Sequence, residues 1–234
     1  MRNLVILMYL RLVFSQNISF SVGETLTYDA FISGIPAGSG ELKVCDIDTI
    51  SNLPVYHVQF RAWTTGFTKK LYPLDDKINI WLDQESLNTI KVIKKIKQGS
   101  YKKNSISHLN HSEGWAIVDG DSIPIPTGTQ SPYALFYLFR NKNLFSLDKS
   151  IFPTIDGKKI ENLTFSFVPN QRTNVPFGSF ISNKLEPSHT QGKKFKNKGE
   201  MSIWFSDNSV QIPIKILLRL KYGSLELRLK DYTN

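Results

Sequence analysis

Two histidines are the side chains in this sequence whose spacing comes closest to a metal pair. His108 and His111 are three residues apart, a spacing at which two side chains share one face of a helix. The sequence around them is polar and typical of a loop, and no clear third ligand accompanies them, although Glu113 is near. We therefore predict exposed loop histidines, no metal site and no cofactor.

Three aspartates could provide paired carboxylates for general acid–base catalysis, namely Asp75, Asp76 and Asp207. Each lies beside a turn signal, where an aspartate commonly bonds to its own backbone. His57 alternates with apolar residues and is expected to be a satisfied histidine of a sheet. The sequence has no nucleophile elbow, phosphate-binding glycine loop or dinucleotide fingerprint. We predict no catalytic residues, and a hydrolase with an unrecognised site is the minor alternative.

Aromatic side chains are numerous enough to line an apolar cavity of the size of a lipid. Most aromatic residues of a β domain belong to its core, so a filled interior is the competing interpretation. The candidates for contact with an apolar ligand are Trp63, Phe67, Tyr72, Trp81, Phe136, Tyr137, Phe139 and Trp204.

Lysines are concentrated in the stretches 91–103 and 193–198. They indicate either a solvated strand face that blocks pairing between sheets or attraction to anionic lipid headgroups or polysaccharide, which salt would screen. The candidate contacts to an anionic headgroup are Lys94, Lys95, Lys97 and Arg140. Arg140 ends an apolar run, where it is expected to satisfy the last carbonyls of a helix or to pair with Asp76 or Asp207.

A hydrophobic period of two dominates the chain and predicts short antiparallel strands. The expected strands cover 24–32, 41–47, 55–63, 78–82, 89–96, 115–118, 122–125, 163–168, 178–185, 201–205, 212–220 and 224–229. Gly34 and Gly38 are expected to allow turn conformations, and Pro213 implies an edge strand or a bulge. Ser131 and Pro132, followed by an apolar run, predict a short buried helix over about 132–142.

These elements predict a mainly β fold, a curved antiparallel sheet or incomplete β-barrel with the helix against its concave side. No linker divides the chain, so residues 16–234 are expected to form a single domain. Residues 1–15 lack acids and combine a basic start with a short apolar run, which is typical of a signal peptide. A buried first strand or a mis-assigned start is the alternative, since Arg11 interrupts the run. No later apolar run is long enough to predict a transmembrane helix.

Charge and cysteine content narrow the function classes. The 234 residues carry 29 basic and 20 acidic side chains, a net charge of +9, in an ordinary globular composition that excludes global disorder. A single cysteine, Cys45, excludes an intramolecular disulfide. In an exported protein the positive charge favours an anionic lipid or polysaccharide over nucleic acid as a partner.

An ordered set of short motifs resembles a known family. The motifs are GETLTY (23–28), GIPAG (34–38), DD (75–76), IWLD (80–83), SPYALFYLFR (131–140), IWFSDN (203–208), IPI (212–214) and GSLEL (223–227). Together they resemble the exported bacterial proteins catalogued as domain of unknown function 3108, over about 23–229. The resemblance implies a location in the periplasm or envelope of a Gram-negative-type bacterium and no assigned activity. In broad shape the family is similar to periplasmic lipoprotein carriers, an analogy of fold alone.

The leading hypothesis is an exported, non-enzymatic envelope protein that binds an apolar or amphipathic, lipid-like ligand in a β half-barrel. Its acyl chain would lie against the aromatic residues, with lysines at the rim. The alternative is an envelope structural, protein-interaction or polysaccharide-binding module with a filled core. A continuous internal cavity favours the first hypothesis, whereas a packed core with an exposed apolar patch favours the second. The sequence leaves the oligomeric state open.

Overall fold

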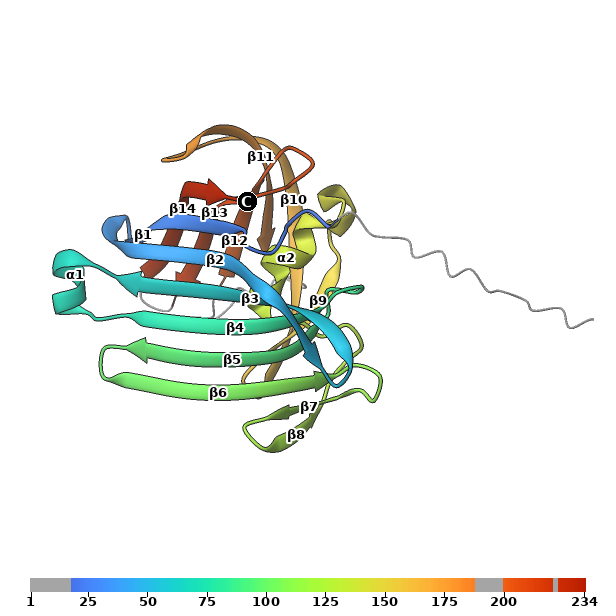
Figure 1. The fold of residues 1–234 in the computed structure, drawn as a ribbon. Coiled ribbons are helices and arrows are strands. Elements are labelled where there is room, and N and C mark those ends of the chain that lie inside the picture. Colours follow the sequence, from blue (N-terminus) through green and yellow to red (C-terminus); the bar gives the residue numbers. More distant parts are fainter. Residues whose placement is uncertain (1–17, 188–199, 221–222) are drawn as a thin grey trace, which may run out of the picture.

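The computed structural model describes residues 18–187, 200–220 and 223–234. Within them, fourteen strands form one antiparallel sheet in the order β8-β7-β6-β5-β4-β3-β2-β1-β14-β13-β12-β11-β10-β9 (Figure 1). The strands are β1 (Thr25–Ile32), β2 (Ile35–Ile50), β3 (Leu53–Thr64), β4 (Asp75–Asp83), β5 (Thr89–Gln98), β6 (Tyr101–Asn110), β7 (Trp115–Val118), β8 (Asp121–Pro124), β9 (Ile151–Asp156), β10 (Lys159–Val175), β11 (Gly178–Pro187), β12 (Glu200–Ser206), β13 (Pro213–Leu220) and β14 (Gly223–Thr233). The sheet curves without closing, so the prediction of a mainly β, incomplete barrel is confirmed.

The predicted buried helix lies on the concave side of this sheet (Figure 1). It begins with the 3-10 turn η1 (Pro132–Ala134) and continues as α2 (Leu135–Arg140). All six residues of α2 are buried, which explains why the sequence has an unbroken apolar run there instead of an amphipathic period. Ser131 precedes the helix in an extended conformation, but its side chain makes no capping hydrogen bond.

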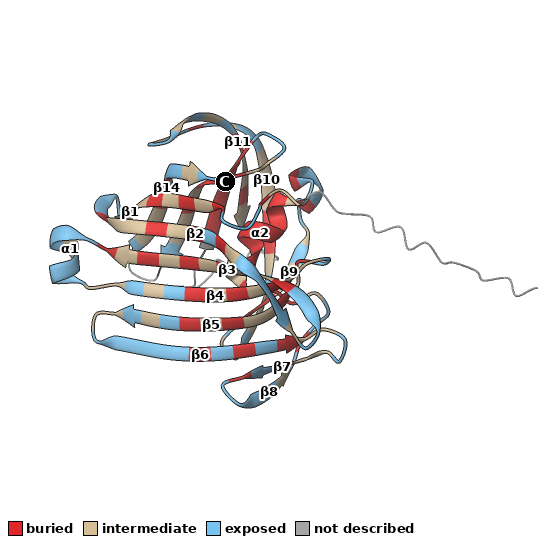
Figure 2. Ribbon diagram, viewed as in Figure 1, coloured by how far each residue is buried: buried red, intermediate tan, exposed pale blue. Residues whose placement is uncertain are grey.

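Strand alternation builds the core. On β4, Ile78, Ile80 and Leu82 face inward and are at most 1% exposed, and the residues between them point outward (Figure 2). The same period of two places inward-facing residues of β1, β2, β3, β12, β13 and β14 in one cluster with α2. The helix therefore packs into the space that the curved sheet encloses and forms one core with these strands.

The two ends of the sheet meet without a continuous backbone ladder. Gln130 lies between them: its backbone N–H donates to the carbonyl of Pro153, while the carbonyl of Gln130 accepts from Ile155 of β9. Its side-chain oxygen accepts from the backbone and hydroxyl of Thr89 on β5, at 2.9 and 2.8 Å. A small apolar cluster that includes Leu109 and Ile155 packs across the same seam. Gln130 and this apolar cluster thus bridge the gap between the two edges, and the sheet itself stays open.

Several local predictions are wrong. The polar sequence around His108 belongs to the strand β6, and the strand β9 was not predicted. The short helix α1 (Gly66–Leu71) is also unexpected. Gly34 does adopt a positive φ of 83° in a turn, but Gly38 lies within β2, where a Cβ would come within 1.9 Å of the carbonyl oxygen of Trp63.

Other predictions hold or lie outside the described part. Pro213 begins β13, opposite a register shift between Trp204 and Phe205 of β12, as expected of a proline at a bulge. The predicted signal segment 1–15 and the lysine stretch 193–198 lie outside the described residues.

We expect the substitution Gln130→Ala to lower the free energy of unfolding by about 1–3 kcal/mol, because it leaves two buried donors of Thr89 without their acceptor. Urea denaturation measures this loss. The control is Gln171→Ala, which removes one exposed bond to Pro169 and should cost less than about 0.5 kcal/mol. Equal losses in the two variants would show that Gln130 does not hold the seam.

Candidate functional site

The predicted aromatic ligand site is not one place in the molecule. Phe136 and Phe139 of α2 are fully buried. The ring of Phe139 makes edge-to-face contacts with Phe165 and Phe152, at centroid distances of 5.2 and 5.0 Å, and Phe136 lies 6.1 Å from Phe60. These rings pack on one another, as core residues do.

The three predicted tryptophans lie on the outer, convex face of the sheet instead. Each is half-buried, and a cation lies over each indole ring. Arg61 is 4.9 Å from the ring of Trp63, Lys91 is 5.0 Å from Trp81, and Trp204 is covered by two lysines, Lys184 and Lys215. Such contacts stabilise an exposed aromatic face by about 0.5–1 kcal/mol and indicate a structural role.

Phe67 and Tyr72 lie at one end of the sheet, on and after α1, and this end is exposed (Figure 2). The hydroxyl of Thr68 donates to the carbonyl of Pro36 in the β1–β2 connection. On its other side, the ring of Tyr72 lies against Gly99 of the β5–β6 turn. We call this end the tip and define it by Ile35, Phe67, Lys69, Lys70, Leu71, Tyr72 and Tyr101.

The predicted headgroup lysines divide between the two faces of β5. Lys95 and Lys97 point outward and line an open groove of about 530 Å³ beside the tip. We call it the basic groove, and its charged members are Arg61, Asp75, Lys77, Lys95, Lys97 and Lys102. Asp75 is engaged by Arg61 at 2.9 Å. The four lysines have no ion-pair partner among the described residues, which leaves a net positive surface.

Lys94 points inward from the same strand. Its ammonium is paired with Asp156 of β9 and lies 5.5 Å from the centroid of the Tyr133 ring. Lys94 lines a cleft of about 220 Å³ on this side of the sheet. Asp76 lines the same cleft and accepts a hydrogen bond from the backbone N–H of Lys97 at 3.0 Å. Burial raises the pKa of Asp76 despite its hydrogen bonds, and burial also raises the pKa of Tyr133.

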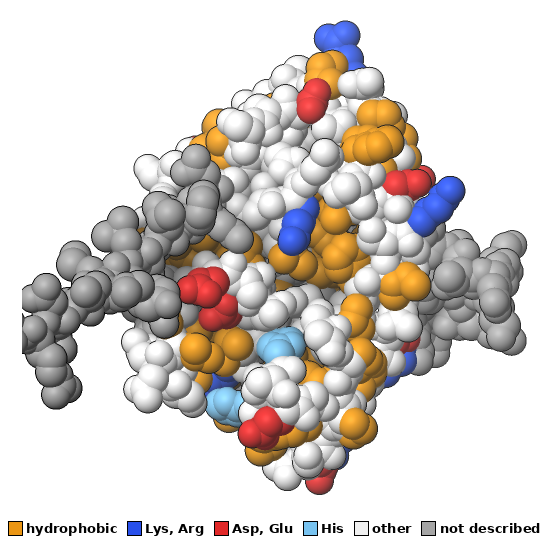
Figure 3. All heavy atoms as spheres, turned by 90° about the vertical axis from the view of Figure 1, so that its right-hand side faces the viewer, with side chains coloured by type: hydrophobic (Ala, Val, Ile, Leu, Met, Phe, Trp, Pro, Cys, Tyr) orange, Lys and Arg blue, Asp and Glu red, His pale blue; other side chains and the backbone are white. Residues whose placement is uncertain are grey.

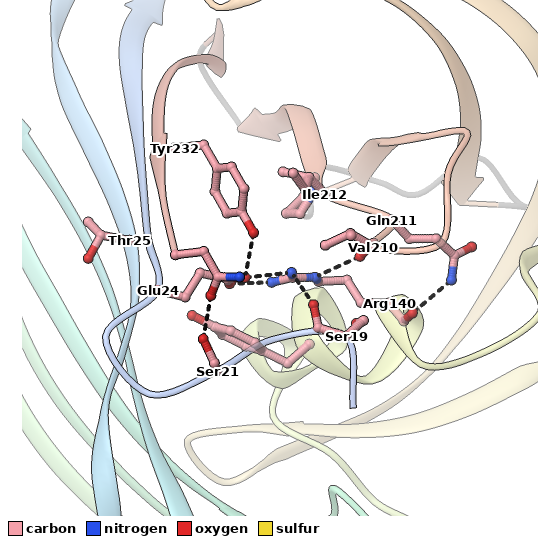
Figure 4. Close-up of polar contacts among 12 residues, drawn as sticks. Ser19, Ser21, Glu24, Thr25, Arg140, Val210, Gln211, Ile212 and Tyr232 are labelled. Carbon is pink, nitrogen blue, oxygen red and sulfur yellow. Dashed lines mark hydrogen bonds and ion pairs between the residues drawn. The ribbon is translucent and has the colours of Figure 1, made fainter. Parts of the chain in front are cut away.

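Arg140, the fourth predicted headgroup contact, is only 2% exposed and bonds elsewhere. Its guanidinium forms a two-pronged pair with Glu24, with Nη2 to Oε2 at 2.7 Å, and both side chains are 1% exposed (Figure 4). It also donates to the carbonyls of Ser19 and Val210, at 2.8 and 3.3 Å. The predicted pairing with Asp76 or Asp207 is therefore wrong. Desolvation opposes the charge on Arg140, but the bonds to Glu24 outweigh it and raise its pKa.

The candidate catalytic carboxylates do not converge. Asp75 and Asp76 are on opposite faces of β4, and Asp207 accepts from Asn183 at 2.9 Å. His57 contacts Asp46 and Asn79, at 3.2 and 3.1 Å, and is satisfied within the sheet as predicted. Among the described residues, no three His, Cys, Asp or Glu side chains are placed to hold a metal.

The model of the family described as "Protein of unknown function (DUF3108)" matches residues 25–230. The chain belongs to this family. The match covers nearly all of the sequence, so the resemblance drawn from the ordered motifs is confirmed. A comparison with curated proteins gives no match.

Solved structures share the fold of this DUF3108 protein. A beta-barrel-like protein of domain of unknown function DUF1849 from Brucella abortus is 11% identical, with a TM-score of 0.56 over 90% of this chain and 97% of that one. The hypothetical protein CT021 from Chlamydia trachomatis is 9% identical, with a TM-score of 0.40 over 92% and 88% of the two chains. The first supports an open, barrel-like fold. No helix in the described ranges is long and apolar enough to cross a bilayer.

We expect Arg140→Ala to destabilise the protein by about 3–5 kcal/mol, because it leaves the carboxylate of Glu24 buried without its partner. Thermal and urea denaturation measure the loss. Arg61→Ala is the matched control, since it removes an arginine whose ion pair is exposed, and it should cost less than about 1 kcal/mol. An unchanged melting temperature for the first variant would contradict this role of the buried pair.

A second expectation concerns pH. The pKa of Asp76 is raised in the folded protein, so its contribution to stability is complete below the ordinary aspartate value of about 3.9 and is lost as the pH rises through the folded value. Asp76→Asn should therefore match the wild type in acid and become the more stable of the two as the pH approaches neutrality.

Urea midpoints between about pH 3 and about pH 7 test this expectation. Asp231→Asn, at an exposed position, is the control and should follow the wild type throughout. A stability difference between Asp76→Asn and the wild type that does not change with pH would contradict the assignment.

Proposed function

We propose that this protein is exported to the envelope of a Gram-negative-type bacterium and binds anionic lipid there without catalysing a reaction. In this proposal it binds with its outer surface at the tip and does not enclose an acyl chain. The filled concave side, where α2 packs against the sheet, supports surface binding. The single observation that carries the proposal is the exposed apolar cluster of the tip beside lysines that have no ion-pair partner in the described part of the chain.

The apolar part of the tip is unusually exposed. Phe67, Leu71 and Ile35 are 73%, 70% and 68% exposed, although they come from two neighbouring connections of one sheet. Adjacent large apolar side chains in water are unfavourable and commonly mark a contact surface. Burial of all three in the boundary between headgroups and acyl chains would contribute about 4–6 kcal/mol.

The charged part of the tip is complementary to an anionic surface. Lys69 and Lys70 lie in the last turn of α1 and are exposed. The basic groove continues this positive surface, because Lys97 and Lys102 flank the β5–β6 turn, whose Gly99 donates to the carbonyl of Pro73 just after α1. A lysine near an anionic leaflet contributes about 1 kcal/mol. Lys95 and Lys97 keep their proposed role as headgroup contacts, whereas Lys94 points into the barrel.

An envelope structural or protein-interaction module is the second candidate. A packed core with an exposed apolar patch is the arrangement expected of such a module, in contrast to a carrier that encloses its ligand. The two candidates differ in what the tip recognises. Lipid binding requires both the apolar cluster and the lysines, and it responds to the charge of the lipid.

We expect the purified protein to cosediment with vesicles of phosphatidylglycerol and phosphatidylcholine, to bind phosphatidylcholine vesicles weakly, and to bind less as salt increases. The double substitution Lys69→Gln/Lys70→Gln should weaken binding to the anionic vesicles about 30-fold, since each lysine contributes about 1 kcal/mol. Phe67→Ser/Leu71→Ser should reduce it at least as much.

Two matched controls test whether vesicle binding depends on the tip itself or on any exposed lysine or apolar side chain. Lys142→Gln/Lys149→Gln removes the same charge from exposed positions away from the tip, and Ile181→Ser removes an apolar side chain that is 53% exposed on β11. Both should bind as the wild type does. Absence of binding to anionic vesicles, or equal losses in the control variants, would refute lipid binding at the tip and favour the interaction module.

A further inference from the structure

A second surface feature lies at the end of the sheet opposite the tip. The strands β2 and β3 run between the two ends, and their hairpin turn meets the β4–β5 and β6–β7 turns there. The three turns enclose an open groove of about 450 Å³, which we call the end groove. Figure 3 looks onto this end and shows hydrophobic and histidine side chains beside hollows in the surface. The volume of the end groove is in the range of sites that bind small ligands.

The end groove differs from the tip in charge. No lysine or arginine lines it, and Asp83 provides its one carboxylate. One oxygen of Asp83 is already occupied, since it accepts from the backbone N–H of Ser86 and from its hydroxyl, both at 2.7 Å. Its other oxygen has no hydrogen-bond partner among the described residues, and Lys91 is paired with His108 across β5 and β6 without being one of the lining residues. The lining therefore carries little charge, in contrast to the basic groove.

Uncharged hydrogen-bonding groups line the end groove instead. His108 has no hydrogen-bond partner among the described residues, and partial desolvation together with Lys91 lowers its pKa, which favours the neutral form of the ring. The side-chain amide nitrogen of Asn110 is also without a described partner. His111 donates from Nε2 to the carbonyl of Thr89 at 2.8 Å, which leaves Nδ1 as an acceptor, and this buried atom has no partner. A ligand rich in hydroxyl groups would provide hydrogen-bond partners for the accessible members of this set, the ring of His108 and the amide of Asn110.

Trp115 gives the end groove an aromatic wall. Its indole N–H donates to Glu113, but no cation of the described residues lies over its ring, unlike the rings of Trp63, Trp81 and Trp204. Leu53, 45% exposed, adds apolar surface. An uncapped aromatic face beside neutral polar groups suits a ligand with one apolar face and a polar rim.

We propose that the end groove binds a segment of an uncharged oligosaccharide. The C–H face of one sugar ring lies on the indole of Trp115, and its hydroxyls exchange hydrogen bonds with His108 and Asn110. This inference does not depend on lipid binding, because the two surfaces lie at opposite ends of β3, whose 12 residues span roughly 36 Å.

The test is a titration of the full chain, labelled with 15N, with maltotriose and with the trimer of N-acetylglucosamine, without vesicles. The four tryptophan indole signals are followed by NMR, and Trp115→Phe assigns the relevant one. We expect at least one trisaccharide to shift the Trp115 signal saturably and to leave the Trp63 signal unchanged. Trp115→Ala should weaken binding more than tenfold, and Asn110→Ala about three- to tenfold.

Trp63→Ala is the matched control, since it removes a tryptophan from the same outer face, and it should bind as the wild type does. Thermal melting establishes that each variant is folded; if Trp115→Ala is not, Trp115→Phe, which retains an aromatic ring, should keep most of the affinity while Asn110→Ala loses it. No shift with either trisaccharide, equal losses in the Trp63 and Trp115 variants, or a shift at Trp115 with short-chain phosphatidylglycerol instead would overturn the proposal.

Discussion

The buried pair of Arg140 and Glu24 is the interaction on which the interior of this protein depends. Two opposite charges that are 1% exposed are tolerated only when each is paired and fully hydrogen-bonded. The pair meets this condition by recruiting backbone from distant segments: the carbonyl of Ser19 before β1 and that of Val210 before β13. One guanidinium therefore fixes the N-terminal segment, the end of α2 and a late turn against one another.

This constraint determines where function can be located. Because α2 is held on the concave side, its rings pack against the sheet there and do not line an open pocket. The surfaces on which we look for a binding site are the outer face and the two ends of the sheet. β2 and β3 connect these ends directly, from Ile35 at the tip to Leu53 at the end groove. A protein that contacts a leaflet with one end would thus present the other end away from it.

Much of the fold follows from the sequence, whereas the partner of Arg140 does not. A period of two predicts strands with inward Ile and Leu, and Pro132 before an apolar run predicts the helix, because both signals are local. Glu24 and Arg140 are 116 residues apart, so their contact depends on how the sheet curves. The strand β6 escapes prediction for a different reason: its first four residues are all exposed, and an exposed strand segment has the polar composition of a loop.

For the outer-face tryptophans, the sequence already contains the signal that places their rings outside the barrel. Trp81 lies between the inward-facing Ile80 and Leu82, so strict alternation already places it outside, whereas aromatic character alone favours a cavity. An indole ring on the outer face is either covered by a side chain of the protein or left uncovered. A cation from the neighbouring strand can cover it, as Lys91 covers Trp81, and its apolar face is then satisfied within the protein.

Among the described residues no such cation lies over the rings of Phe67 or Trp115, and these two rings lie at opposite ends of the molecule. Cations cover the rings of Trp63, Trp81 and Trp204, so Phe67 and Trp115 differ from these three tryptophans in their surroundings. The surroundings then distinguish the two ends. Lysines lie next to Phe67, which favours an anionic apolar surface, whereas neutral donors and acceptors surround Trp115, which favours a ligand without charge.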